Sequence, residues 1–395
     1  MKKTFLCLLL ADLMLSLVAA CESDDSDFSS YTLVSSSEDD DDDDDVSNVT
    51  DTIVITYDGQ SATVTGDADG HVTLSGADVV VDDTVSQHGL VLVLSGSTSD
   101  GSLLVWRSKK YTIVLNGVSI TNADGPAINN QCSKSLFIVC GEGTENTLAD
   151  GTAYAEQTYD QKGTLFSEGQ IYFSGSGTLN VTANSKNAIA SDDFIAIGDT
   201  LASAANDFTI NTTSSASASN GVKANDGVFV YGGTLTVSVA ADGARGIRSD
   251  ARVDITGGTI DITTTGDCLI EQVDGVADTT SCACIKSDSL FTMSGGTLTM
   301  LSTGDGGKGI RCDEDIRFSG GTLVATTTGS NDISKPKALK SDTGIIVSGG
   351  SFKAEVSKSW ACDNGTESED PADHLTVVGT PSKAEIAKKS VVIVY

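Results

Sequence analysis

The chain has 395 residues, of which 39% are hydrophobic, so it is long enough to bury the core of one large domain or two smaller ones. Only 5% of the residues are aromatic and four are proline, whereas 41 are glycine, which favours many short strands joined by turns. The net charge of −31 at pH 7 argues against a nucleic-acid partner, because phosphates require a basic surface.

Residues 1–20 have the organisation of an export signal. Lys2 and Lys3 precede an apolar stretch, and small residues lead to a cysteine. The sequence Val18-Ala19-Ala20-Cys21 resembles a bacterial lipobox, so Cys21 is predicted to carry the lipid that is the protein's membrane anchor. The alternative is an ordinary cleaved signal followed by a chance cysteine. The lipobox predicts an outer membrane lipoprotein exposed on the cell surface.

Residues 21–50 are predicted to be a disordered acidic tether. Residues 22–45 include 12 acidic side chains and no basic one, and such a run repels itself and cannot bury surface. Acids directly after a lipidated cysteine also resemble surface-export signals of bacterial lipoproteins, and a simple spacer is the alternative. The remaining residues, 46–395, hold 42 acids and 22 bases, so this part of the chain is acidic too and favours bound cations or neutral partners.

After the tether, residues 51–110 are predicted to form an N-terminal cap with the first strands, residues 111–355 a series of repeats, and residues 356–395 a C-terminal cap. Five repeats share a basic residue that lies nine residues before the first glycine of a Gly-Gly pair. The basic residues are Lys223, Arg248, Lys286, Arg311 and Lys340, and the first glycines are Gly232, Gly257, Gly295, Gly320 and Gly349. A fainter copy starts at Leu165 and places Ser167 at the basic position.

Each repeat alternates aliphatic and polar residues, as strands do, and is too short to bury its apolar side alone. Units of this size must stack, so the predicted fold is all-β, a parallel β-helix in which like residues form ladders. One internal stack is expected to contain Ile189, Val222, Ile247, Ile285, Ile310 and Leu339. The glycine pairs are expected at corners that exclude a side chain or require positive φ.

The separation from the glycine pair to the next basic residue varies between repeats. It is 16 residues after Gly232 but 29 after Gly257 and 20 after Gly320, so all insertions fall at one corner of the coil. Loops gathered on one face of a repeat protein often form its binding face, and neutral drift of loop length is the alternative.

The segments 115–128 (LNGVSITNADGPAI) and 141–151 (GEGTENTLADG), together with the Gly-Gly-Thr coils, resemble bacterial carbohydrate-binding β-helix proteins. The resemblance covers roughly residues 80–355. It implies a right-handed, single-stranded parallel β-helix similar to pectate lyases, with N- and C-terminal caps. It also implies binding of calcium and of acidic plant or microbial polysaccharides such as polygalacturonate, without demonstrated cleavage.

Two rows of carboxylates flank the aliphatic stack and are the candidate metal ligands. Asp242, Asp267, Asp305 and Asp332 precede the stack at the variable corner, and Asp250, Asp288 and Asp313 belong to the row that follows it. Stacked carboxylates repel unless they are neutralised, and calcium does this with six to eight oxygen ligands. For the second row, salt bridges to the neighbouring basic ladder are the favoured alternative, because a base lies beside each of these residues. Calcium is therefore the predicted cofactor, principally at the corner row.

The basic ladder (Lys223, Arg248, Lys286, Arg311 and Lys340) is the candidate ligand-binding set, because Lys and Arg make charge-assisted bonds to uronate carboxylates. The same residue types could serve a pectate-lyase-like elimination, but they repeat identically, whereas an active site is a single asymmetric place. The other alternative is a structural or adhesive rod. We expect a binding protein, monomeric, with no catalytic residue assigned.

Cysteines matter because an exported protein meets an oxidising compartment. In the repeat alignment Cys268 falls at Gly243 and Cys284 at Gly246, so the 13-residue insertion is expected to begin and end at one turn. A disulfide from Cys268 to Cys284, or to Cys282, is predicted to close that loop.

Overall fold

The structure is a computed structural model and describes residues 47–198, 206–273, 276–330, 332 and 334–395. The signal peptide, the lipid site at Cys21 and the tether up to residue 46 lie outside the described residues. Strand β1 (Ser47–Gly59) begins within the segment predicted to be tether.

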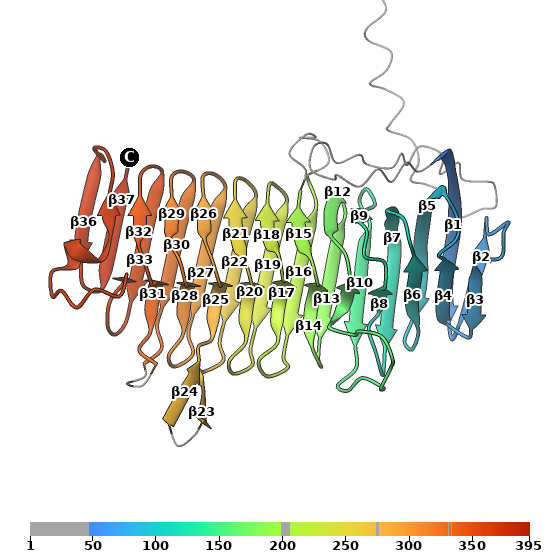
Figure 1. The fold of residues 1–395 in the computed structure, drawn as a ribbon, viewed down its shortest axis with the longest axis horizontal. Helices are drawn as coiled ribbons and strands as arrows, with labels where there is room; N and C mark the ends of the chain where they lie inside the picture. The colour runs from blue at the N-terminus through green and yellow to red at the C-terminus, as the bar shows by residue number, and fades with distance from the viewer. Residues whose placement is uncertain (1–46, 199–205, 274–275, 331, 333) are drawn as a thin grey trace, which may run out of the picture. The chain divides into compact units, whose positions relative to one another are not determined.

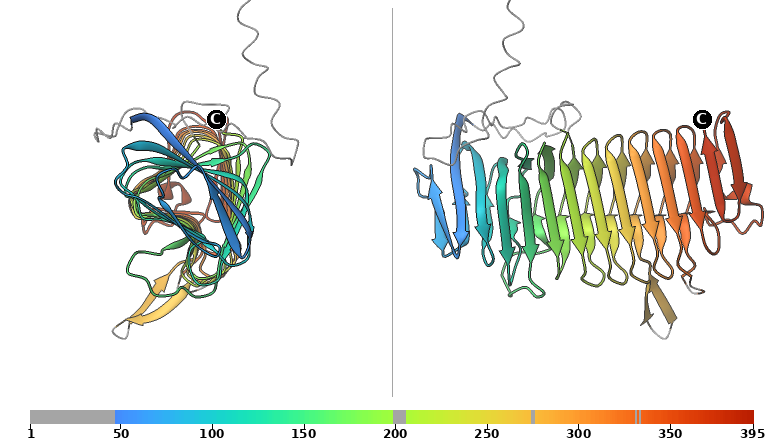
Figure 2. Two further views of the ribbon diagram at one scale, coloured as in Figure 1. Left: turned by 90° about the vertical axis from the view of Figure 1, so that its right-hand side faces the viewer. Right: turned by 180° about the vertical axis from the view of Figure 1, so that it is seen from behind.

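The described residues form a solenoid of short strands in which like strands of successive coils pair in parallel. Figure 1 shows the coils stacked along one axis, and the left view of Figure 2 looks along that stack. The predicted parallel β-helix is confirmed. Each regular coil contributes three strands, called here the first, second and third strand of the coil.

The first strands make one sheet, which contains β4 (Asp78–Asp83), β6 (Ser102–Arg107), β8 (Ile128–Asn130), β11 (Gly163–Ser167), β14 (Asn187–Ser191), β17 (Asn220–Ala224), β20 (Arg245–Ser249), β25 (Ala283–Ser287), β28 (Lys308–Cys312), β31 (Lys337–Ser341) and β34 (Cys362–Asp363). Strand β3 (Val72–Ser75) extends this sheet at its N-terminal edge and pairs antiparallel with β4. The second strands are β9 (Leu136–Cys140), β12 (Ile171–Gly175), β15 (Phe194–Ile197), β18 (Gly227–Val230), β21 (Arg252–Ile255), β26 (Phe291–Met293), β29 (Ile316–Phe318), β32 (Ile345–Val347) and β35 (Thr376–Val377). The third strands are β10 (Glu145–Asp150), β13 (Thr178–Ala183), β16 (Thr209–Ser214), β19 (Thr234–Val239), β22 (Thr259–Thr264), β27 (Thr297–Ser302), β30 (Thr322–Thr327) and β33 (Ser351–Val356).

Near the N-terminus, longer strands replace the separate second and third strands. These are β1, β5 (His88–Thr98) and β7 (Tyr111–Asn122), and β7 pairs with both β9 and β10. Strand β2 (Ser61–Thr65) folds back antiparallel on β1. At the other end, β36 (Lys383–Ala387) and β37 (Ser390–Val394) form a hairpin whose second strand pairs antiparallel with β33. A short 3-10 helix, η2 (Pro371–His374), precedes this hairpin.

The core runs along the inside of the coils. The predicted aliphatic stack is confirmed in register, and all six of its side chains are 0% exposed: Ile189, Val222, Ile247, Ile285, Ile310 and Leu339. Each such burial contributes roughly 1.5–3 kcal/mol relative to an exposed side chain. Repetition of one inward position from coil to coil therefore supplies the main stabilisation of the solenoid.

The glycine pairs lie at the corner between second and third strands, and the two glycines answer different constraints. The second glycine has a positive φ of 72° to 80° in all five repeats. The first glycine lies against the preceding coil, where a Cβ on Gly257 would come 2.2 Å from the carbonyl oxygen of Tyr231. The second glycine also lies against the preceding coil, where a Cβ on Gly296 would come 2.6 Å from the carbonyl oxygen of Gly257, so both expected reasons for glycine act at the second residue of the pair.

The placement of Ser167 at the basic position was wrong by one residue. Phe166 pairs with Ala190, which pairs with Lys223, so Phe166 occupies that position. This coil has one residue more at the corner between β12 and β13 than later coils have. Counting nine residues back from the glycine pair therefore reached a position one residue away from the true one.

The longest variable-corner insertion is the hairpin of β23 (Leu269–Val273) and β24 (Val276–Thr280). It connects β22 to β25 and projects from the side of the solenoid in Figures 1 and 2. Among the described residues, none belongs to a helix with the length and apolar character needed to cross a membrane.

Candidate functional site

The predicted basic ladder lies on the outward face of the first strands. Lys223, Arg248, Lys286, Arg311 and Lys340 occupy one register position in successive coils. Their neighbours in the aliphatic stack point inward, so alternation along the strand directs the basic side chains outward. These side chains are 16% to 31% exposed, which means that their stems are largely covered while their charged ends reach the surface.

Four of the five bases in the ladder contact carboxylates of two coils, and Lys223 contacts Asp250 of the next coil and the amide oxygen of Asn225 in its own. Lys286 Nζ lies 2.6 Å from Asp288 of its own coil and 2.7 Å from Asp313 of the next. Arg311 lies 3.1 Å from Asp313 and 2.7 Å from Asp342. The result is a continuous row of alternating charges along the solenoid.

The carboxylate of Asp250 shows the electrostatic effect of this row. Burial works against ionisation there, but hydrogen bonds and charges from Lys223 and Arg248 outweigh it and lower the pKa of Asp250. Asp250, Asp288 and Asp313 form ion pairs with the basic ladder, as expected if salt bridges and not a metal ion neutralise this row. A metal ion at these three residues would have to compete with bases already in place.

The corner row makes a different pattern. The Oδ1 atom of Asp242 accepts the backbone N–H of Asp267 at 2.8 Å, and that of Asp267 accepts the N–H of Asp305 at 2.7 Å. Asp305 Oδ1 in turn accepts the N–H of Ser330, so Ser330 takes the place expected for the fourth aspartate. All three aspartates are exposed, and in the part of the chain that the structure describes the second carboxylate oxygen of each makes no hydrogen bond or ion pair.

Asp332 lies apart from this row and pairs with Lys358 at 2.6 Å. Its displacement follows from the longer loop that precedes β31. The structure therefore brings three of the four predicted corner residues together and separates the fourth.

Two groups of three possible metal ligands occur among the described residues, and neither contains a predicted metal residue. One is Asp160, Glu168 and Asp192, where Lys162 lies 2.6 Å from Asp160 and also pairs with Asp192. Burial and the two neighbouring carboxylates raise the pKa of Glu168. The lysine already supplies a positive charge between two of these carboxylates.

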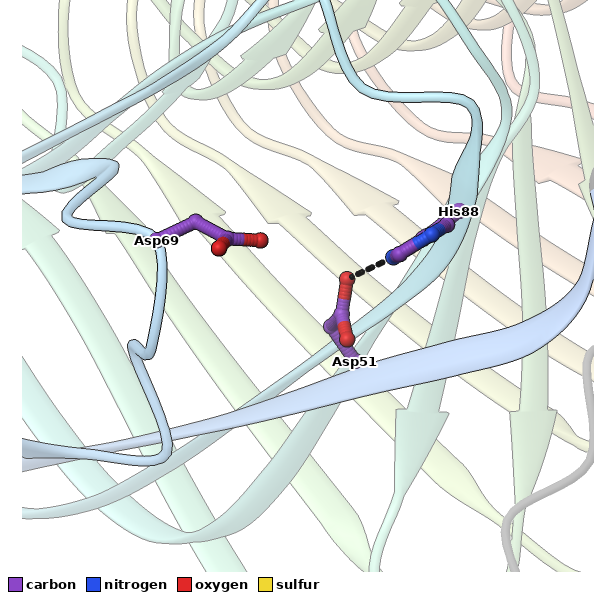
Figure 3. A group of neighbouring side chains, drawn as sticks. All are labelled: Asp51, Asp69 and His88. Atoms are coloured by element: carbon purple, nitrogen blue, oxygen red, sulfur yellow. Dashed lines mark hydrogen bonds and ion pairs between the residues drawn. The ribbon is translucent and has the colours of Figure 1, made fainter.

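The second group is Asp51, Asp69 and His88, shown in Figure 3. No pattern of neighbouring residues marks His88 in the sequence, because Asp51 comes 37 residues earlier and is brought near by the parallel pairing of β1 with β5. Asp69 lies in the loop between β2 and β3. A sequence pattern cannot signal this group, since three unrelated segments meet there.

A run of aromatic rings was also missed. Phe137, Tyr172, Phe194, Phe229 and Tyr231 lie side by side on the second strands and the corner after β18, with successive ring centroids 5.0 to 6.5 Å apart. Three of these positions share one outward register column, and only the alignment of whole coils could have revealed it.

The predicted disulfide between Cys268 and Cys284 is absent from the structure, where Cys284 is a free thiol. Cys284 aligns with Gly246, but that glycine lies within β20, and a Cβ there would meet the side chain of Ile262 at 2.3 Å. The side chain of Cys284 accordingly points into the core, where its sulfur lies 3.8 Å from Thr264 Oγ1. The alternative partner Cys282 is likewise a free, buried thiol, and burial raises its pKa to about 11.

Comparison with known proteins gives three findings. A sequence model of the family described as carbohydrate-binding domain-containing protein matches residues 76–269 and 243–332. A protein of the same description from Acetivibrio thermocellus is 32% identical over 108 residues, which make up 26% of this chain. The match spans only 38% of that relative's length.

The third finding is a similar solved structure, titled "Structure of the polysaccharide lyase-like protein from C. thermocellum, Gadolinium derivative". The similarity has a TM-score of 0.53 and covers 68% of this chain and 97% of the other, with 23% sequence identity. At this identity the likeness concerns the fold.

Proposed function

The chain belongs to the carbohydrate-binding domain-containing protein family, and on that premise we propose that it is a non-catalytic, calcium-dependent binder of an acidic polysaccharide such as polygalacturonate. The observation that carries the proposal is the basic ladder, a row of side chains in register with one base per coil. Successive bases are separated by about one strand spacing, roughly 4.8 Å. A polymer with one carboxylate per sugar offers a comparable series of acceptors.

The arginines of the ladder can hold uronate carboxylates without losing their own ion pairs. A guanidinium has five donors, and Arg311 meets only three acceptors, the carbonyl of Cys312 and the carboxylates of Asp313 and Asp342. An ammonium has three donors, and the ladder lysines contribute mainly their charge, since Lys286 already meets the Ser287 carbonyl and two aspartates. Charge-assisted hydrogen bonds of this kind are each worth about 1.5–3 kcal/mol. Several of them along a polymer give affinity through repetition.

Calcium is proposed to act at the corner row. Asp242, Asp267 and Asp305 present exposed carboxylates, one per coil, with one oxygen held by a backbone N–H. An ion that takes the outward oxygens of the protein and those of a uronate would link two negative partners. This arrangement explains how an acidic protein could retain an acidic glycan.

We further propose that the lipid at Cys21 anchors the monomeric solenoid to the outer membrane and that it is exposed on the cell surface. The lipobox and the acidic run that follows it support this placement.

The test measures retention of the protein on polygalacturonate and on a neutral β-glucan, each with calcium or with chelator, while the absorbance of unsaturated products is followed. Calcium-dependent retention on polygalacturonate without new absorbance is expected. The double variant Lys286→Gln/Arg311→Gln should weaken retention by roughly tenfold or more, because it removes two positive charges of the ladder and the free guanidinium donors of Arg311. Asp267→Asn/Asp305→Asn keeps the oxygens that accept backbone N–H groups and should abolish the calcium dependence.

The matched control is Lys353→Gln/Lys383→Gln, which removes two positive charges from exposed ion pairs outside the ladder. Equal weakening in this control would mean that net charge, and not the ladder, sets retention. Rising absorbance would identify a polysaccharide lyase, and retention on neither polymer would leave a structural or adhesive rod.

A further inference from the structure

We propose that Asp51, Asp69 and His88 form a binding site for a divalent transition-metal ion, with Zn²⁺ as the representative ion. The site lies at the N-terminal end of the solenoid and is independent of the proposed polysaccharide function. Three segments supply its side chains: β1, the loop between β2 and β3, and the first residue of β5. Figure 3 shows the Asp69 carboxylate directed toward the pair formed by Asp51 and His88.

The donor atoms are already close to the separation that such an ion needs. One donor from each residue lies within 4.8 Å of the other two, and His88 Nδ1 lies 2.8 Å from Asp51 Oδ2. Metal–ligand distances of 2.0–2.2 Å place tetrahedral ligands about 3.4 Å apart. Rotation of the Asp69 side chain, which is 64% exposed, can close the remaining gap.

A second, buried carboxylate lies behind the site. The side chain of Asp83 is 5% exposed, and its Oδ1 atom has no hydrogen-bond partner in the part of the chain that the structure describes. That oxygen lies 3.7 Å from Nε2 of His71, and the same nitrogen lies 3.9 Å from Asp69 Oδ2. Asp83 is paired with Arg107 through its other oxygen, so one buried carboxylate oxygen without a hydrogen bond faces His71, which in turn lies beside Asp69 of the cluster.

A guanidinium lies among the carboxylates of this region. Arg107 pairs with Oδ2 of Asp83 and donates to the backbone carbonyl of His88, so it fixes the backbone from which the imidazole extends. Against this single guanidinium stand the carboxylates of Asp51, Asp69 and Asp83. Carboxylates therefore outnumber the guanidinium around the cluster, which favours a bound cation.

The imidazole decides the class of ion. Calcium and magnesium prefer oxygen donors, whereas imidazole combined with carboxylates suits zinc and neighbouring transition metals. Such an ion binds the neutral imidazole, so it displaces the proton that His88 Nδ1 shares with Asp51. Bound there, it would join β1 to β5 and to the loop between β2 and β3.

The experiment uses the full-length protein and the imidazole NMR signals of its three histidines, His71, His88 and His374, which single substitutions assign. Addition of one equivalent of Zn²⁺ should shift the His88 signals and leave those of His374 unchanged, and excess Ca²⁺ should not reproduce the shift. His374 is the internal reference, because it lies stacked on Trp360 near the opposite end.

Titration calorimetry with Zn²⁺ is the second measurement. His88→Gln and Asp69→Asn should each weaken the His88-dependent binding event by roughly tenfold or more. Asp58→Asn removes the same charge from an exposed residue of β1 outside the cluster and should leave the event unchanged. Asp69 is an exposed loop residue, so its variant keeps the test valid if His88→Gln unfolds.

Two results would overturn the site. One is a His88 signal that Zn²⁺ does not move. The other is equal loss of binding in Asp58→Asn, which would assign the ion to acidic residues in general, including the run from 39 to 45.

Discussion

At the residue scale, the corner glycines carry the tightest constraint in the coil. Gly296 has a φ of +74°, and a Cβ there would lie 2.6 Å from the carbonyl oxygen of Gly257 in the preceding coil. Gly117 has nearly the same φ, +73°, but a Cβ there would meet nothing within 4 Å. Comparing substitutions at the two glycines therefore distinguishes the cost of a positive φ from the cost of a steric contact between coils.

We expect Gly296→Ala to lower the free energy of unfolding by roughly 2–4 kcal/mol, because a positive φ and a backbone contact act together. Gly117→Ala should cost only about 1 kcal/mol, since the positive φ acts alone. Urea unfolding of both variants checks this. If both variants lost a similar free energy of unfolding, the backbone would accommodate a Cβ between the coils with little added cost.

Lys308 is a buried base at the variable corner. It is 6% exposed, and its Nζ atom donates to the carbonyls of Gly306 and Lys335 at 2.7 and 2.8 Å. Burial, followed by the charge of Lys337, lowers its pKa to about 8. The charged form is therefore disfavoured by folding.

This shift predicts a pH dependence of stability. Between pH 8 and 10.5 the unfolded chain binds more protons at Lys308 than the folded one, so the free energy of unfolding rises with pH. At about 1.36 kcal/mol per pKa unit, the rise is on the order of 3 kcal/mol. Lys308→Met should lack this rise. Urea unfolding of both proteins from pH 7.5 to 10 is the measurement, and parallel profiles would contradict the assignment.

At the element scale, the C-terminal hairpin covers the last coil. Strand β37 pairs antiparallel with β33, and Ile393 is 0% exposed. Without this hairpin, β33 would be an open edge beside the apolar end of the core, where Phe352 lies. Open edges of this kind template pairing with other chains.

We expect a chain that ends at Gly379 to self-associate through β33, and light scattering after gel filtration measures this. The matched control deletes residues 270–279, the projecting hairpin of β23 and β24, which pair only with each other among the described strands. That deletion should leave the molecule monomeric. A monomeric truncated chain would show that the cap does not protect the edge.

At the scale of the whole solenoid, one repeated residue position becomes a column of like groups. The same register makes an aliphatic column inside, a basic column outside and a row of aspartates at the corner. A binding surface made in this way is long and uniform, which suits a polymer better than a small molecule. The repeat is interrupted at the two ends of the solenoid, and the cluster of Asp51, Asp69 and His88 lies at the N-terminal end.

The alternation within each coil and the nine-residue spacing were sufficient to predict the β-helix, the inward stack and the positive φ of corner glycines such as Gly258. These features depend on sequence separations of a few residues within one coil. Because coils of equal length stack in register, each residue then lies beside the equivalent residue of the next coil. Counting failed where a coil differed in length, as at Ser167 and at Asp332, because residues added at a corner shift the positions beside it.

The sequence by itself determined which residues share a column, because a constant repeat converts spacing along the chain into register. Only the tertiary structure decided which atoms meet between columns and at the ends. It directed Cys284 into the core, gave the corner aspartates backbone N–H donors, and brought Asp51 and Asp69 to His88. Those contacts depend on how irregular loops and strands fold over the coils, and no periodic signal in the chain encodes that path.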